Sequence, residues 1–226
     1  MKSQSSPSLQ VLISGAAGNL GTALTSSLKS RGHHAIGVGR SKPDHFTGDA
    51  FYEADLSSEA SVNLLFESLS RDWPLLNGAV FTTGGFAGGT LAELDLRQLE
   101  DQVKLNFHTA MLPAIQLFKR WSNDHILGRM VFPGSMPGIE PRTAVDAAAY
   151  GISKSMLFHF SGMINAAGQQ NGIRSAVAVI PAMATPQNKL NMSVSQLSDL
   201  VAPETVAERI IRFLEGATES DYIRFS

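Results

Sequence analysis

Short apolar runs alternate with longer segments of helical periodicity along almost the whole chain. The first run lies at 9–14, and a helical pattern follows it from Leu20 until Gly32. Six further runs lie at 35–38, 51–54, 78–82, 130–133, 175–180 and 222–225. Continuously apolar strands are what a parallel sheet requires when helices cover both of its faces. The pattern predicts an α/β fold with one doubly wound domain, a sheet of about seven parallel strands and helices on both faces.

Apolar residues at helical spacing predict further helices at 62–69, 99–122, 148–171 and 206–214. The chain shows no internal repeat and no linker, and 43% of its 226 residues are apolar, which is enough to bury a sizeable core. We therefore expect one domain over residues 9–226. Residues 1–8 are polar and rich in serine, so we expect a short disordered tail there.

Composition excludes several classes of function. The net charge is −2, and the 18 lysines and arginines form no cluster, which argues against nucleic acid as a partner. The chain has no cysteine, so disulfides and thiol catalysis are excluded, and its six histidines show no metal-ligand spacing. No apolar run approaches the roughly 20 residues that span a membrane, and no signal peptide is recognisable. We expect a cytoplasmic protein without a metal.

A glycine motif, SGAAGNLG, joins the first predicted strand to the first helix at 14–21. Glycines at this position let the backbone approach a pyrophosphate, and the helix start offers free N–H groups and partial positive charge. A glycine triplet can also simply end a strand, but the strand before it and the helix after it favour a dinucleotide cofactor. The predicted cofactor contacts are Ser14, Gly15, Gly18, Asn19, Leu20 and Gly21.

A second motif is Tyr150-Gly-Ile-Ser-Lys154 at the start of a predicted helix. Residues four apart share one helix face, so the lysine charge is expected to lower the pKa of the Tyr150 phenol. Such a pair also arises by chance on a solvated face. Its place after a loop rich in glycine and proline, together with the glycine motif, favours a catalytic role.

These motifs resemble those of the short-chain dehydrogenase/reductase family, and the resemblance extends from Leu9 to Phe225. It implies a Rossmann-type fold, a nicotinamide cofactor and a small-molecule carbonyl (or imine or quinonoid) substrate reduced by hydride transfer. It also implies a catalytic set of Asn106, Ser135, Tyr150 and Lys154. Further cofactor contacts implied by the resemblance, besides Tyr150 and Lys154, are Asp55, Leu56, Thr83, Gly84, Pro181 and Thr185.

The resemblance gives each catalytic residue a role. Tyr150 is the general acid, and Lys154 binds the nicotinamide ribose and lowers the pKa of Tyr150. Ser135 polarises the substrate carbonyl. Asn106 holds a water that relays protons to solvent.

The chain departs from the family pattern at four places. The glycines at 15, 18 and 21 are three residues apart rather than four and then two, as in atypical and extended members of the family. Residues 82–85 read Thr-Thr-Gly-Gly where the family usually has Asn-Asn-Ala-Gly, and Ala182 follows Pro181 in place of the usual glycine. The separation between Ser135 and Tyr150 is about two residues longer than usual. Within the family, the glycine-rich loop at 84–89 is most similar to that of the quinoid dihydropteridine reductases.

The end of the second strand predicts the choice of cofactor. Gly39 stands where an acidic residue would repel a 2′-phosphate, and Arg40 follows it with a planar, charged fork. Ser41 and Lys42 add further donors. We therefore expect NADP(H) to be preferred over NAD(H); the alternative is that Arg40 is a solvated loop charge.

Two other functions fit the same pattern. A non-catalytic dinucleotide sensor would share the fold, and a nucleotide-sugar epimerase or dehydratase is suggested only by the glycine spacing. The epimerase would need more chain than the roughly 45 residues that follow Pro181.

The helices predicted at 99–122 and 148–171 are apolar on more than one face, so we expect a homodimer or homotetramer.

Overall fold

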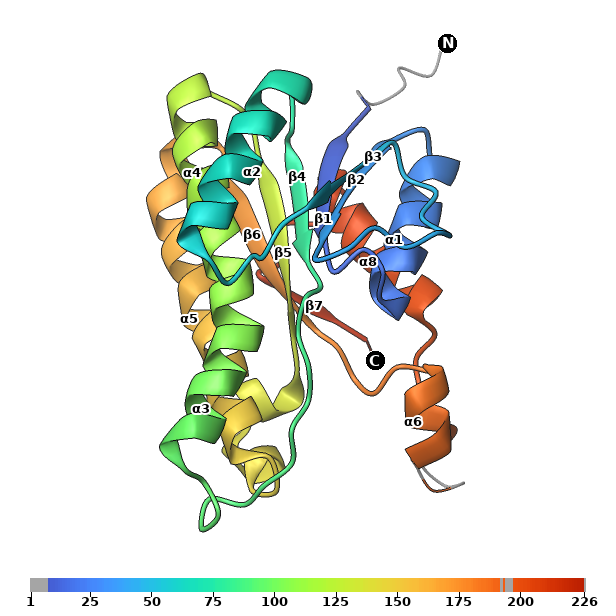
Figure 1. Cartoon of the computed structure of the whole chain (residues 1–226), viewed down its shortest axis with the longest axis vertical. Helices are drawn as coiled ribbons and strands as arrows, with labels where there is room; N and C mark the ends of the chain where they lie inside the picture. Colours follow the sequence, from blue (N-terminus) through green and yellow to red (C-terminus); the bar gives the residue numbers. More distant parts are fainter. Residues whose placement is uncertain (1–7, 192, 194–196, 226) are drawn as a thin grey trace.

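Seven parallel strands form the centre of the molecule. The computed structural model describes residues 8–191, 193 and 197–225. All seven strands run in the same direction, in the order β3-β2-β1-β4-β5-β6-β7 (Figure 1). Their bounds are β1 Gln10–Ser14, β2 His34–Gly39, β3 Ala50–Glu53, β4 Gly78–Phe81, β5 Arg129–Gly134, β6 Arg174–Val179 and β7 Tyr222–Arg224. The strand order reverses between β1 and β4, and that point is where such sheets open a crevice for ligands.

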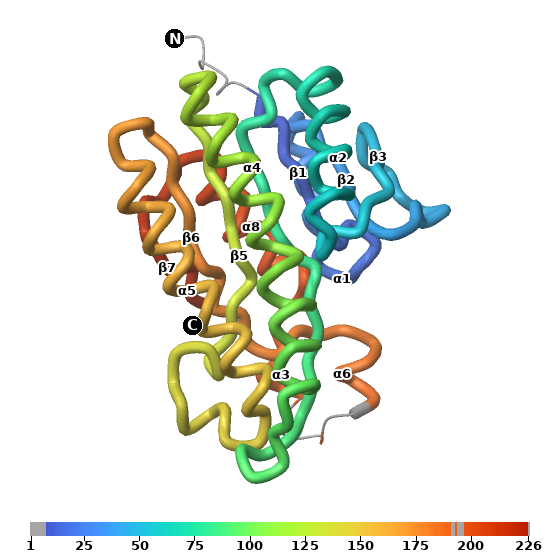
Figure 2. Tube along the Cα trace, turned by 60° about the vertical axis from the view of Figure 1, so that its left-hand side comes forward, coloured from blue at the N-terminus to red at the C-terminus, as the bar shows by residue number. Residues whose placement is uncertain are grey.

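Helices cover both faces of the sheet. Figures 1 and 2 show α2, α4 and α5 on one face and α1 with α8 on the other. Their bounds are α1 Asn19–Ser30, α2 Glu59–Asp72, α4 Thr109–Asp124, α5 Ala148–Gly168 and α8 Pro203–Leu214. Two shorter helices, α3 (Leu96–Val103) and α6 (Pro186–Asn191), lie at the end of the molecule toward which the strands run (Figure 1). No helix among the described residues combines the length and the hydropathy needed to cross a bilayer.

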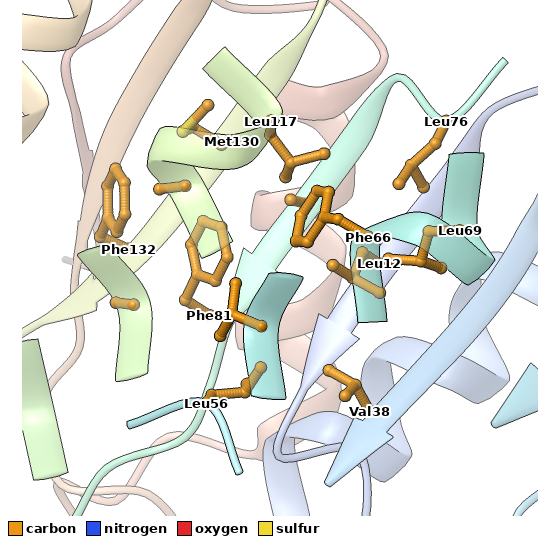
Figure 3. Close-up of a cluster of buried hydrophobic side chains, with 14 of the residues drawn as sticks. Leu12, Val38, Leu56, Phe66, Leu69, Leu76, Phe81, Leu117, Met130 and Phe132 are labelled. Carbon is orange, nitrogen blue, oxygen red and sulfur yellow. The ribbon is translucent and has the colours of Figure 1, made fainter. Parts of the chain in front are cut away.

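The strands contribute side chains to two separate core layers. Leu12 of β1 packs with Val38, Phe81 and Phe132 under α2, α4 and α5, and Figure 3 shows this layer. Its chain neighbour Ile13 packs in the opposite layer, under α1 and α8. Because successive strand residues point to opposite faces, a strand buried on both faces must be apolar throughout. The predicted doubly wound α/β fold is therefore confirmed.

Three elements differ from the sequence-based expectations. The helix expected at 99–122 begins at Leu96, where Asp95 forms a capping box, and a π-helical turn at Lys104–His108 separates α3 from α4. The helix expected to reach 171 ends at Gly168, and a 3-10 turn at Gln169–Asn171 leads to Gly172, which has a φ of 68°. Helix α6 was not expected, since six residues are too few to show a period.

The predicted disordered tail lies almost wholly outside the described residues, since residues 1–7 are not among them. Ser8 is exposed, and its hydroxyl donates a hydrogen bond of 2.8 Å to the carbonyl of Gly32.

Candidate active site

A cleft of about 600 Å³ opens at the carboxyl ends of β1, β2 and β4. Gly15 and Gly18 follow β1, Arg40 follows β2, and Gly84 follows β4 in its lining. Carboxyl ends of parallel strands meet at one edge, so residues far apart in sequence converge there without further folding. The cleft therefore lies at the switch point of the strand order.

The glycine motif has the backbone that a phosphate cradle requires. Gly15 has a φ of 62°, and a Cβ on it would lie 2.9 Å from the backbone nitrogen of Thr83. A Cβ on Gly21 would collide with the carbonyl oxygen of Gly15. Gly18 is the N-cap of α1 and supplies no side-chain cap, so the first N–H groups of the helix remain available to an anion.

The other predicted residues of this motif have different surroundings. Ser14 is buried, and its hydroxyl accepts a 3.1 Å hydrogen bond from the backbone N–H of Thr83. Thr82 donates through its hydroxyl to the carbonyl of Ser14 at 2.5 Å. Leu20 packs in the core layer under α1 and α8, and Asn19 borders a neighbouring cavity of about 730 Å³. The side chains of Ser14 and Leu20 thus hold the turn in place.

The end of the cleft lined by Arg40 and Asp55 carries charged groups of both signs. Asp55 accepts hydrogen bonds from the hydroxyl of Ser57 at 2.7 Å and from its backbone N–H at 2.9 Å. These two bonds lower the pKa of the Asp55 carboxyl, with smaller contributions from Lys104 and Arg40. Leu56 is buried beside it.

An acid at this end escaped the sequence analysis. Glu53 lies directly opposite Gly39 in the β2–β3 register, and its carboxylate accepts a 3.1 Å hydrogen bond from the backbone N–H of Lys42. A reading confined to the end of β2 cannot find a carboxylate that the neighbouring strand supplies.

Lys154 is buried beneath Tyr150 on α5. Its ammonium donates a 2.8 Å hydrogen bond to the carbonyl of Pro133 and lies 5.8 Å from the centre of the Tyr150 ring. Burial lowers the pKa of the Lys154 amine to about 8, because removal from water disfavours the charged form.

The pKa of the Tyr150 phenol moves in the opposite direction from the one expected. Burial raises the phenol pKa, and interaction with the Ser135 hydroxyl lowers it by less. The expectation that Lys154 lowers this pKa is not met in this structure, because desolvation of the ring dominates. Tyr150 is therefore a protonated phenol at neutral pH.

Ser135 follows β5 and has a buried hydroxyl that is close to Tyr150 but makes no hydrogen bond of good geometry within the described residues. Buried hydroxyls are nearly always paired, so an unpaired one beside Tyr150 is suited to an incoming ligand. The longer connection to Tyr150 is taken up by 3-10 turns at Met136–Gly138 and Pro141–Ala144.

Asn106 lies in the π-helical turn and is almost fully buried. Its Oδ1 accepts a hydrogen bond of 2.9 Å from the backbone N–H of Gly85, and its Nδ2 donates one of 3.0 Å to the carbonyl of the same residue. A Cβ on Gly84 would lie 2.7 Å from Asn106 Oδ1 and 3.5 Å from Lys154 Nζ. The turn after β4 is thereby held against the side chains of Asn106 and Lys154.

Pro181 and Thr185 follow β6 on the segment that leads into α6. Thr185 is buried, and its hydroxyl accepts a 3.2 Å hydrogen bond from the backbone N–H of Asn188 in the first turn of α6. The side chain of Asn188 donates to the carbonyl of Met183 at 2.9 Å. Thr185 thus directly precedes α6, and its hydroxyl hydrogen-bonds the first turn of that helix.

An aromatic side chain lies against Tyr150. The ring of Phe86, on the loop after β4, meets the Tyr150 ring edge to face at 5.1 Å and remains 71% exposed. Met136 and Ile139 on the loop after β5 are exposed apolar neighbours in sequence to Ser135. An aromatic residue amid glycines was the available signal for this position.

Among the described residues, no three histidine, aspartate or glutamate side chains gather as a metal site.

Comparison with known proteins finds one family and a common fold. The family model described as short chain dehydrogenase matches residues 10–193. A search of curated proteins finds no match. Among solved structures, a short chain dehydrogenase from Leptospira borgpetersenii with bound NAD+ has a TM-score of 0.83 at 16% identity and covers 99% of this chain and 93% of its own.

Two other solved structures show the same fold. An oxidoreductase of the short chain dehydrogenase/reductase family from Burkholderia thailandensis has a TM-score of 0.82 at 18% identity, covering 96% of this chain and 92% of its own. Serine dehydrogenase from Escherichia coli has a TM-score of 0.80 at 17% identity, covering 96% and 97%.

The buried amine of Lys154 predicts that its removal stabilises the protein in a pH-dependent way. We expect Lys154→Met to raise the free energy of unfolding at pH 7 by about 1–3 kcal/mol, since a drop in pKa from 10.5 to about 8 corresponds to about 3 kcal/mol and Pro133 loses its donor. Below about pH 8 both states bind the proton and the folded state carries the full desolvation cost. The gain should shrink between pH 8 and 10.5 and vanish above that range.

Denaturant unfolding at pH 7 and at pH 10.5 measures this difference. Lys119→Met, an exposed position on α4, serves as the control and should show no such change. An equal gain for Lys154→Met at both pH values would contradict the assignment of a desolvated amine.

Proposed function

Because this chain belongs to the short-chain dehydrogenase/reductase family, we propose that it is an oxidoreductase that reduces a carbonyl group, with Tyr150 as general acid. The observation that carries the proposal is that Ser135 and Lys154 lie close to Tyr150, while Lys154 and Asn106 lie beside Gly84, which lines the cleft. The experiment that tests it is oxidation of NADPH over a panel of ketones, quinones and quinonoid dihydropterin. Turnover with any of them would also exclude a non-catalytic dinucleotide sensor.

The residues of the cleft fit a nicotinamide dinucleotide. Gly15, Gly18 and Gly21 leave a cradle that any side chain would fill, and the first turn of α1 carries no acidic residue. This is the environment that a pyrophosphate needs. Asp55 lies at the far end of the cleft for the adenosine. When bound, the cofactor supplies the hydride.

The chain's own residues supply the orientation and the proton. The unpaired hydroxyl of Ser135 donates a hydrogen bond to the substrate oxygen and holds it beside Tyr150. Because burial raises the phenol pKa, Tyr150 retains its proton until negative charge develops on that oxygen. Lys154 has two further N–H donors beyond the bond to Pro133, and these bind the ribose hydroxyls in the proposed complex.

A second candidate substrate is favoured by Phe86. The ring lies edge to face on Tyr150 and is largely exposed, so it offers an aromatic surface to a flat substrate beside the general acid. Reduction of a quinonoid dihydropterin, as in the dihydropteridine reductases that the 84–89 loop resembles, fits this arrangement. Turnover of simple ketones but not of quinonoid dihydropterin would decide against it.

Removal of the phenol hydroxyl tests the general acid. We expect Tyr150→Phe to lower kcat by roughly 10²- to 10⁴-fold, because that is the usual contribution of general acid catalysis. Cofactor affinity should remain within about threefold, since the ring is retained. Steady-state kinetics and fluorescence titration of NADPH measure the two effects. Near-normal turnover of this variant would refute the assignment of Tyr150.

Arg40 tests the choice of cofactor. We expect the wild type to prefer NADPH, mainly through KM, because Arg40 is exposed at the mouth of the cleft and can bind a 2′-phosphate. A hydrogen bond to a charged group contributes roughly 1.5–3 kcal/mol, so Arg40→Ala should narrow the preference by about 10- to 100-fold. Adding Gly39→Asp to that variant should reverse it.

The kcat/KM values for NADPH and NADH measure this preference. Arg212→Ala, an exposed arginine on α8, is the matched control and should leave the ratio unchanged. Equal or better kcat/KM with NADH in the wild type would contradict the proposed role of Arg40.

Assembly is the remaining proposal. Leu105, Ile152 and Met163 are exposed apolar residues. Leu105 lies in the π-helical turn between α3 and α4, and the other two lie in α5, which runs beside these helices in Figure 2. We expect these helices to pair with a second copy, giving two or four times the 24.2 kDa of one chain in light scattering. Met163→Glu should shift the mass toward the monomer. Leu75→Glu, at an exposed position between α2 and β4, should leave the mass unchanged. A wild-type mass near that of one chain at micromolar concentration would refute the prediction.

A further inference from the structure

Helix α3 buries a single residue, and that residue is polar. Gln102 is 8% exposed, while the remainder of the helix lies at or near the surface. Burial of an amide is costly unless its polar atoms are hydrogen-bonded. Gln102 Oε1 accepts a 3.0 Å hydrogen bond from Nδ2 of Asn106. The burial of Gln102 is therefore explained by a partner in the candidate active site.

The hydrogen bonds of Asn106 define what Gln102 adds. One end of the Asn106 amide is taken by Gly85, which donates to Oδ1 and accepts from Nδ2. An amide nitrogen carries two hydrogens, so one remains. That hydrogen has two acceptors, Gln102 Oε1 at 3.0 Å and Ser153 Oγ at 3.1 Å. Ser153 donates its own hydrogen to the carbonyl of Tyr150 at 2.8 Å.

Packing alone does not hold the Gln102 side chain. Gln102 borders a small cavity of about 210 Å³ whose lining also includes Gly88, Gln98 and Ala149. A side chain with open space beside it keeps rotamer freedom unless a directional bond removes it. The hydrogen bond to Asn106 is such a bond, and it crosses the start of the π-helical turn, where the regular helical ladder is interrupted.

We propose that Gln102 is a positioning residue for Asn106. It holds the Asn106 carboxamide from the side of α3, and Asn106 in turn holds the Gly84–Gly85 turn against Lys154. The effect on turnover rests on the proposed function, because it requires Asn106 and Lys154 to serve carbonyl reduction. The effect on the Gly85 hydrogen bonds does not depend on that function.

Replacement of the accepting oxygen tests the proposal. Gln102→Met keeps the length of the side chain and removes the acceptor, and we expect kcat to fall about tenfold, the scale of a small misplacement of catalytic groups, with the KM for NADPH changed less than about threefold. Gln102→Glu keeps an accepting oxygen in either protonation state and should restore most of the lost kcat. Gln98→Met, which alters the same helix and the same cavity, should retain wild-type kcat.

Hydrogen exchange at the Gly85 amide supplies a readout that does not need turnover. Its N–H donates to Asn106, so its protection should decrease in Gln102→Met and remain in Gln102→Glu and Gln98→Met. Wild-type kcat and protection in Gln102→Met would overturn the proposal, as would equal losses in Gln98→Met or no recovery in Gln102→Glu. If the wild type reduces no carbonyl, the proposed function fails while the exchange data still test the position of Asn106.

Discussion

A parallel sheet covered on both faces leaves only the ends of its strands for chemistry, and this constraint organises the whole molecule. Leu12 and Ile13 enter opposite core layers, so the apolar centre of β1 carries no polar group, and the site begins only at Ser14, the last residue of the strand. The same is true of β4 and β5, whose polar residues Thr82 and Ser135 come directly after the last strand residues. The cleft then forms where the strand order reverses, because helices on the two sides diverge there.

Burial also sets the electrostatics of the site. Lys154 is buried and Tyr150 is half-buried, and desolvation favours the neutral form of each, raising the pKa of Tyr150 and lowering that of Lys154. The amine keeps a carbonyl partner and Asn106 is fully bonded, whereas Ser135 has a hydroxyl without one among the described residues. Ser135 therefore has an unused hydroxyl for the substrate oxygen in the proposed reaction, and Lys154 keeps two unused N–H donors for the ribose.

Local patterns were sufficient for the strands, the helices on both faces and the glycine cradle, because these depend on residues close in sequence. The family resemblance also named Asn106, Ser135, Tyr150 and Lys154, and their catalytic roles stay predictions. The sequence could not indicate the π-helical turn, the burial of Gln102 or the acid at Glu53, since each depends on a neighbour from another element. The direction of the Tyr150 pKa was missed for the same reason: charge spacing along a helix says nothing about desolvation.

The environment of Arg40 illustrates how such neighbours bear on the proposed cofactor preference. Two carboxylates lie at the same end of the molecule, yet Asp55 is bonded by Ser57 and Glu53 accepts from the backbone of Lys42. Among the described residues, Arg40 forms no ion pair with either, so its guanidinium remains available at the cleft mouth. The Glu53 carboxylate on β3 already accepts a hydrogen bond from the backbone, so it repels a 2′-phosphate less than a carboxylate at position 39 would. The proposed preference therefore depends on how the carboxylates are bonded as well as on where they stand.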